Sequence, residues 1–158
     1  MSNNQDVTTA DREVTLTRTF DHPRSLVWRA YTDKDLLARW WGRGNPLEVK
    51  EYEPVRGGFW HLIERADGQE HVFRGRFREV SPEDLIIYSF EYDGMPGHVT
   101  IDHLHFEDLG GTRTRLTSIT QFHTNEERDG MLASGMTDGA ELSFRALERL
   151  LGEEASDA

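Results

Sequence analysis

Acid–base chemistry has three candidate side chains in this sequence: Glu64, Asp102 and Tyr88. Each belongs to a segment that alternates apolar and polar residues as a β-strand does, and each falls on the face that we assign to the interior. A carboxyl or phenol group in a pocket acquires the shifted pKa that proton transfer needs. In the alternative interpretation, Glu64 and Asp102 lie at strand ends in water.

Other catalytic classes lack their residues. The chain has no cysteine, which excludes a disulfide framework, a thiolate metal site and a cysteine nucleophile. It also has no Gly-x-Ser-x-Gly, HExxH or glycine-rich phosphate motif. His103 and His105 would need further ligands to hold a metal, so we expect both rings on the outer face of a sheet and no metal or other cofactor.

Charge narrows the set of partners. The net charge of -11 repels phosphate backbones and anionic lipid, so we expect neither a nucleic acid nor a membrane as partner. Arg74, Arg76 and Arg78 form a basic row, which we interpret as a solvated outer face paired with acidic neighbours. No apolar run approaches the roughly 18 residues of a membrane span, and residues 1–10 do not have the pattern of a signal peptide. We therefore expect a cytoplasmic protein.

The elements that position these groups follow a simple order in a chain of 158 residues. Residues 13–20 alternate as a strand, and two short helices follow up to residue 41. Six alternating segments between residues 47 and 122 are separated by turns rich in Gly, Pro and Asp. A long helix over 124–151 opens with a Thr124–Glu127 capping box.

This order predicts an α+β fold in which a curved antiparallel sheet of about seven strands wraps around the long C-terminal helix. We expect one domain over residues 13–151, between a flexible tail at 1–12 and an acidic tail at 152–158.

Three stretches carry a resemblance to a known family: TRTFDHPRSLVWRAYTDKDLLARWWG, PVRGGFWHLIERADGQEHVFRGRFREVSPEDLIIYSF and GMTDGAELSFRALERLL. Together they resemble the Hsp90-ATPase-activator-homologue-like family, within the START-like helix-grip superfamily, from Glu13 to Leu151. The resemblance implies a cavity between the long helix and the concave face of the sheet.

Strand parity indicates which side chains line such a cavity, because alternate residues share a face. The residues expected to contact a ligand are Trp41, Trp60, Leu62, Phe73, Phe77, Tyr88, Phe90, Leu104, Ser118, Thr120, Met136 and Ala140. In the alternative interpretation, the hydroxyl groups bond to backbone and the methionine is plain core.

Two local features bear on the cavity. Trp40 extends an apolar helical stripe and should seal the core, which leaves Trp41 near the mouth, where residues 42–44 could move as a gate. Three glycines, Gly130, Gly135 and Gly139, weaken the last helix. They indicate a close approach to the sheet, room for a guest molecule, or a kink.

The main hypothesis is a protein, monomeric or homodimeric, that binds a small hydrophobic or amphipathic molecule. The resemblance also implies two alternatives: an interaction module for the Hsp90 chaperone, and a cyclase- or hydratase-like enzyme that uses the pocket carboxylates.

Overall fold

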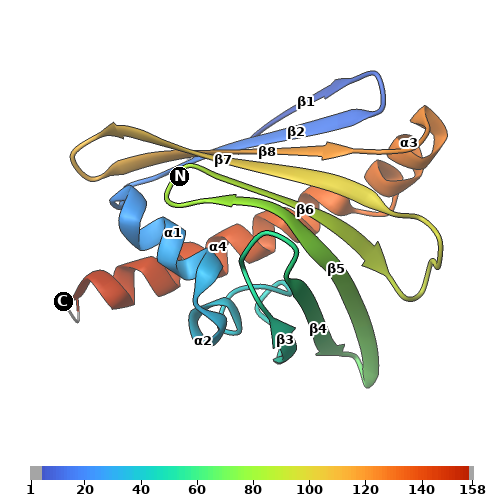
Figure 1. Cartoon of the computed structure of the whole chain (residues 1–158), viewed down its shortest axis with the longest axis horizontal. Coiled ribbons are helices and arrows are strands. Elements are labelled where there is room, and N and C mark those ends of the chain that lie inside the picture. Colours follow the sequence, from blue (N-terminus) through green and yellow to red (C-terminus); the bar gives the residue numbers. More distant parts are fainter. Residues whose placement is uncertain (1–4, 157–158) are drawn as a thin grey trace.

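The computed structural model describes residues 5–156 and shows an open, eight-stranded antiparallel sheet in the order β1-β2-β8-β7-β6-β5-β4-β3 (Figure 1). The strands are β1 (Gln5–Ala10), β2 (Glu13–Phe20), β3 (Leu47–Tyr52), β4 (Phe59–Ala66), β5 (Gln69–Ser81), β6 (Leu85–Tyr92), β7 (Thr100–Gly110) and β8 (Arg113–Gln121). The helices are α1 (Arg24–Thr32), α2 (Lys34–Leu37), α3 (Asn125–Ala133) and α4 (Met136–Ser156).

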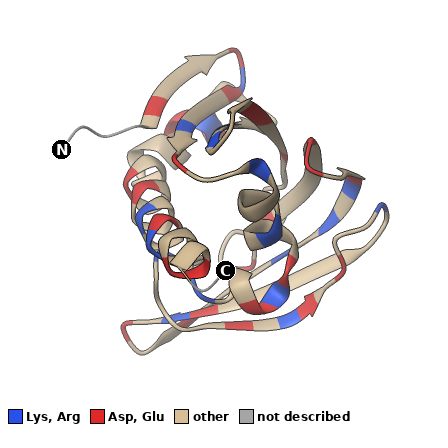
Figure 2. Cartoon of the chain, turned by 90° about the vertical axis from the view of Figure 1, so that its left-hand side faces the viewer, with Lys and Arg blue, Asp and Glu red and all other residues tan. Residues whose placement is uncertain are grey.

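The predicted fold class is confirmed: the sheet curves around α4, and α1 and α2 connect β2 to β3 (Figure 1). Three buried residues of α4, Phe144, Leu147 and Leu151, belong to the same core cluster as concave-face residues of the sheet. Burial of this amphipathic face, rather than helix propensity alone, stabilises α4. Acidic and basic residues are interspersed along the rest of the helix (Figure 2).

The extra strand is β1, which corrects the prediction of a flexible tail over residues 1–12. It pairs with β2 without interruption, from Gln5 opposite Arg18 to Ala10 opposite Glu13. All its residues after Gln5 are exposed, so no apolar alternation announces the strand in the sequence. Residues 1–4 lie outside the described part of the chain.

The predicted C-terminal helix is divided in two. Gly135 has a φ of +95° and separates α3 from α4, so the kink named among the alternatives for the helix glycines is present there. The capping box is confirmed, because the backbone N–H of Glu127 donates to Thr124 Oγ1 at 3.1 Å.

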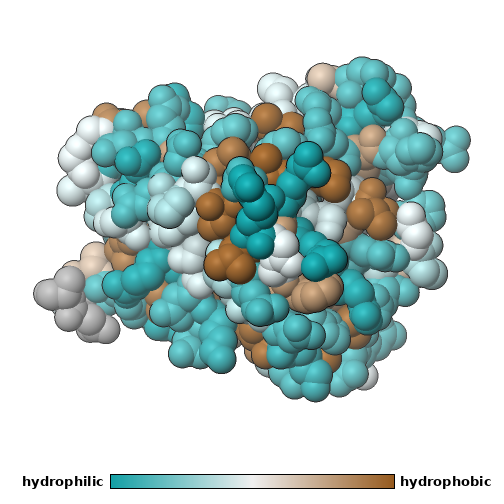
Figure 3. Space-filling model, viewed as in Figure 1, coloured by the Kyte–Doolittle hydropathy of each residue, from teal (hydrophilic) through white to brown (hydrophobic). Residues whose placement is uncertain are grey.

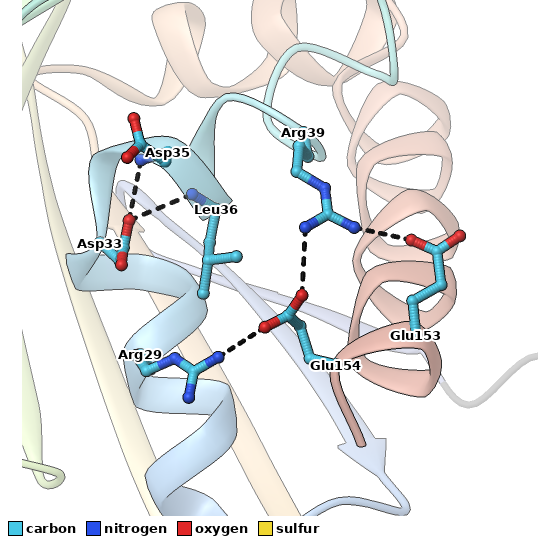
Figure 4. Close-up of polar contacts among 7 residues, drawn as sticks. All are labelled: Arg29, Asp33, Asp35, Leu36, Arg39, Glu153 and Glu154. Atoms are coloured by element: carbon cyan, nitrogen blue, oxygen red, sulfur yellow. Dashed lines mark hydrogen bonds and ion pairs between the residues drawn. The ribbon is translucent and has the colours of Figure 1, made fainter. Parts of the chain in front are cut away.

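The prediction of an acidic tail from residue 152 is wrong as far as residue 156, because α4 continues to Ser156. Glu154 accepts hydrogen bonds from Arg29 and Arg39, and Glu153 accepts one from Arg39 (Figure 4). These ion pairs tie the end of α4 to α1 and to the turn after α2. Residues 157 and 158 lie outside the described part of the chain.

A buried arginine joins the sheet to α4. The side chain of Arg18 on β2 is 4% exposed and donates to Glu141 and Glu148 of α4. Although burial alone would raise it, hydrogen bonds from Arg145 and Arg18 hold the pKa of Glu141 below its ordinary value. Arg18 therefore links strand β2 to helix α4 by ion pairs, and its partner Glu141 lies 123 residues away in the sequence.

Candidate functional site

A cavity of about 320 Å³ lies between the concave face of the sheet, α4 and the connection from α2 to β3. This volume is at the lower end of the range of small-molecule sites. Of the residues expected to contact a ligand, nine line it: Trp41, Phe73, Tyr88, Phe90, Leu104, Ser118, Thr120, Met136 and Ala140.

The other three, Trp60, Leu62 and Phe77, line a separate void of about 30 Å³. Its volume corresponds to roughly one water molecule. Trp41 and Tyr88 line both spaces and so form part of the partition between them. The predicted residues therefore line two separate spaces, and which of them contact a ligand stays a prediction.

The strand parity behind these assignments is confirmed. Trp60 is 4% exposed and its neighbour Phe59 is 47% exposed, so Trp60 lies on the inner face of β4 and Phe59 on the outer face. The register then places Phe77, Tyr88, Asp102 and Thr120 in one row across β5, β6, β7 and β8. Adjacent residues of such a row contact one another on the concave face.

Trp60 depends on a glycine opposite it. Its indole N–H donates to the carbonyl of Ser89 at 3.1 Å, across the place where Gly75 has no side chain. A Cβ at Gly75 would come within 1.8 Å of that carbonyl oxygen and 2.6 Å of the indole nitrogen. The glycine therefore serves a close approach within the wall.

The two adjacent tryptophans differ as predicted in burial. Trp40 is 3% exposed and its indole N–H donates to the carbonyl of Ala30 at 2.9 Å. Trp41 is half-buried, packs edge-on against Phe73 with ring centroids 5.1 Å apart, and lines the cavity. Whether Trp41 contacts a ligand stays a prediction.

Glu64 is buried at the mouth of the cavity, so the interpretation that places it in water at a strand end is wrong. It is 2% exposed and accepts two hydrogen bonds from Arg43, Nε to Oε2 at 3.0 Å and Nη2 to Oε1 at 2.9 Å. Asn45 Nδ2 donates to Oε2 at 2.8 Å. The hydrogen bond to Glu64 raises the pKa of Arg43, which keeps the guanidinium charged.

The backbone around Arg43 is unusual. Gly42, Arg43 and Gly44 all have positive φ, at +82°, +63° and +80°. The Arg43 N–H donates to Ser143 Oγ on α4 at 2.9 Å, and Gly139 leaves space for the Arg43 side chain, whose Cδ would lie 3.5 Å from a Cβ there. Left-handed backbone at a non-glycine residue persists where the surroundings hold it.

Asp102 is also buried, which rules out the solvated interpretation for it as well. It is 7% exposed, and Thr120 Oγ1 donates to Oδ1 at 2.5 Å while Thr100 Oγ1 lies 3.4 Å from Oδ2. Burial raises the pKa of Asp102 to about 6, against the effect of the two hydroxyl groups. Burial, and next the charge of Asp102, also raise the pKa of Tyr88 well above its ordinary value. Tyr88 is therefore a neutral hydrogen-bonding group.

Sequence reasoning missed Arg43, Asn45 and Ser143. The signal that was present is the glycine on each side of Arg43, which favours left-handed backbone. Residues 42–44 were predicted only as a possible gate, and the contact of Arg43 with Glu64 depends on the fold.

The basic row and the histidine pair lie outside the cavity. Arg74, Arg76 and Arg78 are exposed, and Arg74 forms a two-point ion pair with Asp93. The rings of His103 and His105 stack with centroids 6.4 Å apart. Within residues 5–156, no group of three or more His, Asp or Glu side chains is placed to hold a metal ion.

On the surface in Figure 3, the described residues form no large hydrophobic patch that would mark a binding site. On the face shown in Figure 3, hydrophobic residues occur in small groups between hydrophilic ones. Scattered exposed apolar residues of this kind are normal and do not mark a docking surface. Among the described helices, none is long and apolar enough to cross a membrane.

A curved antiparallel sheet that holds a long C-terminal helix over an internal cavity defines the helix-grip class of START-like domains. The family model described as activator of Hsp90 ATPase homolog 1-like protein matches residues 21–152. The chain belongs to this family.

Solved structures agree on the fold. A crystal structure of a protein from Rhodobacter sphaeroides is 26% identical, with a TM-score of 0.85, covering 94% of this chain and 98% of that one. A solution structure from Arthrobacter aurescens is 23% identical, with a TM-score of 0.86, covering 94% and 91%. A crystal structure from Chromobacterium violaceum is 26% identical, with a TM-score of 0.77, covering 89% and 96%. No curated protein matches the chain.

Proposed function

We propose that the protein binds a small amphipathic molecule in the cavity between the sheet and α4. The observation that carries the proposal is the 320 Å³ space itself, which joins aromatic walls to a few polar side chains. An apolar wall supplies affinity, and convergent polar groups fix the orientation of a ligand.

The polar groups are distributed over two ends of the wall. The ion pair joins Arg43, in the connection from α2 to β3, to Glu64 on β4, whereas Tyr88 and Thr120 belong to the row that crosses the sheet. Trp41, Phe73 and Phe90 lie in the aromatic wall. This separation fits an amphipathic ligand better than a purely apolar one.

Two other roles stay predictions. The family name suggests a chaperone partner, and Glu64, Asp102 and Tyr88 remain the catalytic candidates. Glu64 already accepts three hydrogen bonds from Arg43 and Asn45, and the pKa of Tyr88 is raised well above its ordinary value, which leaves Asp102 as the better candidate for proton transfer. A cytoplasmic location is likewise a prediction from the sequence.

The first experiment compares native and denatured masses of the freshly purified protein, followed by titration with the neutral fluorescent probe N-phenyl-1-naphthylamine. We expect a bound mass that is lost on denaturation, or saturable probe binding to the emptied cavity.

A variant that fills the cavity tests the location. Ala140 lines the cavity, whereas Leu142, two residues along α4, is 51% exposed. Ala140→Phe should weaken probe binding at least about tenfold, because the new ring occupies the site, while Leu142→Phe should leave it unchanged. Equal binding by wild type and Ala140→Phe, or no binding by wild type, would contradict the proposal.

A further inference from the structure

Within residues 5–156, the buried Asp, Glu, Lys and Arg side chains are Arg18, Glu64 and Asp102, and two of these three have partners of opposite charge. Arg18 is paired with Glu141 and Glu148, and Glu64 is paired with Arg43. Asp102 accepts hydrogen bonds from two neutral hydroxyl groups, and within residues 5–156 no Lys, Arg or His forms an ion pair with it. A buried carboxylate without a neighbouring cation is costly, so a ligand that brings a positive charge close to it binds more tightly.

Asp102 lies on the concave face between two residues of the cavity wall, although it is not itself a lining residue. Its cross-strand neighbours are Tyr88 on β6 and Thr120 on β8, and both line the cavity. Across the space, α4 presents Met136 and Ala140, which carry no charge. The charged side chains that line the cavity, Arg43 and Glu64, form an ion pair with each other.

The hydrogen bond between Thr120 and Asp102 sets the polarity of the wall. Thr120 donates its only hydroxyl hydrogen to Asp102, so its oxygen can only accept a hydrogen bond from a ligand. The Tyr88 hydroxyl can accept one as well. This part of the wall therefore presents acceptors, with the negative charge of Asp102 between them.

Aromatic rings complete the environment. Tyr88, Phe90, Phe73 and Trp41 line the same cavity, and the electron-rich face of such rings attracts organic cations. The net charge of -11 also favours the approach of cations over anions.

We propose that the amphipathic ligand is an organic cation whose ammonium group lies against Thr120 and Tyr88, close to the Asp102 carboxylate. This inference rests on the ligand-binding function proposed above. It makes Asp102 a specificity-determining residue that acts on the ligand through Thr120 and through its charge.

The test uses three probes of nearly equal shape as competitors of N-phenyl-1-naphthylamine at about pH 7.5. They are the cation 2-(1-naphthyl)ethylamine, the neutral alcohol 2-(1-naphthyl)ethanol and the carboxylate anion 1-naphthaleneacetate. We expect the amine to compete at least about tenfold better than the alcohol, and the acetate to be weakest. Asp102→Asn should reduce the advantage of the amine to about threefold or less, because the charge is lost. Asp108→Asn, an equal change at an exposed position of β7, should keep it.

Thr120→Val is a second variant, which removes the acceptor oxygen while leaving the carboxylate, and it should also reduce the preference for the amine. Three results would overturn the inference while the proposed function stands. The wild type could bind the alcohol as well as the amine, or the preference for the amine could survive both Asp102→Asn and Thr120→Val. The third result is that none of the three probes displaces bound N-phenyl-1-naphthylamine. If N-phenyl-1-naphthylamine itself does not bind, the proposed function fails, and the inference fails with it.

Discussion

The Arg43 guanidinium donates hydrogen bonds to both oxygens of the Glu64 carboxylate, and both residues line the cavity. The two partners are unequal: the Arg43 side chain is 43% exposed and the Glu64 side chain is 2% exposed. Loss of the arginine would leave a buried carboxylate with Asn45 as its remaining partner.

Arg43→Met should therefore destabilise the fold by about 2 kcal/mol, since an unpaired buried charge costs more than a lost surface ion pair. Urea unfolding measures this. Arg74→Met is the matched control, because Arg74 also makes a two-point contact, but with Asp93, whose side chain is 40% exposed. The control should lose no more than about 1 kcal/mol. Equal losses in the two variants would show that the burial of Glu64 carries no special cost.

The buried carboxyl group of Asp102 should give the stability of the protein an unusual dependence on pH. Burial raises its pKa from 3.8 to about 6 in the folded protein, so between these values the folded state binds a proton that the unfolded state does not. The contribution of this group to the free energy of unfolding therefore increases as the pH falls from about 7 to about 4.

Asp102→Asn isolates that contribution, because every other titrating group is common to both proteins. At about pH 7.5 the variant should be more stable than wild type by about 3 kcal/mol, and near pH 4.5 the difference should fall to about 1 kcal/mol. Denaturant unfolding at both pH values measures it. A variant that is less stable than wild type at the higher pH would show that the ionised carboxylate is not a burden on the fold.

The adjacent tryptophans should separate stability from binding. Trp40→Ala should cost about 3–5 kcal/mol, because it empties a buried site and removes the hydrogen bond to Ala30. Trp41→Ala should cost less and should weaken binding of N-phenyl-1-naphthylamine, since its ring is half-buried in the cavity wall. Thermal unfolding and probe titration measure the two effects. Unchanged probe affinity in Trp41→Ala would make this ring an ordinary surface residue.

Two glycines should respond in opposite ways to alanine. Gly75→Ala places a Cβ against Ser89 and Trp60 and should cost about 3 kcal/mol or more. In contrast, Gly130 lies in α3, and a Cβ there meets nothing within 4 Å, so Gly130→Ala should stabilise the protein by about 0.5–1 kcal/mol. The comparison is a pair of urea titrations, and a tolerated Gly75→Ala would mean that the wall around Trp60 can rearrange.

Much of the fold follows from local patterns. Alternation identified the strands from β2 to β8 and put Trp60, Tyr88 and Leu104 on the concave face. The capping box located the start of α3. These features depend on near neighbours in the chain, which a single sequence displays.

The remainder depends on contacts between distant residues. β1 forms because β2 offers it an edge, although its own side chains are largely exposed. The partners of Arg18 lie 123 and 130 residues away, and Arg43 meets Glu64 only once the loop after α2 folds over β4. Burial of Glu64 and Asp102 likewise follows from what covers them, which alternation does not reveal.

The open sheet leaves two free edges that differ in their capacity to accept another strand. The edge at β3 has an irregular register between Val49 and Glu51 and carries the charged side chains of Lys50 and Glu51, features that oppose edge-to-edge pairing. The edge at β1 is regular, and Asp6 is its only charged residue. Unwanted extension of the sheet into aggregates, or its addition to a second chain, is therefore directed to the N-terminal edge, at the opposite end of the strand order from β3 and from β4, which carries the cavity residue Glu64.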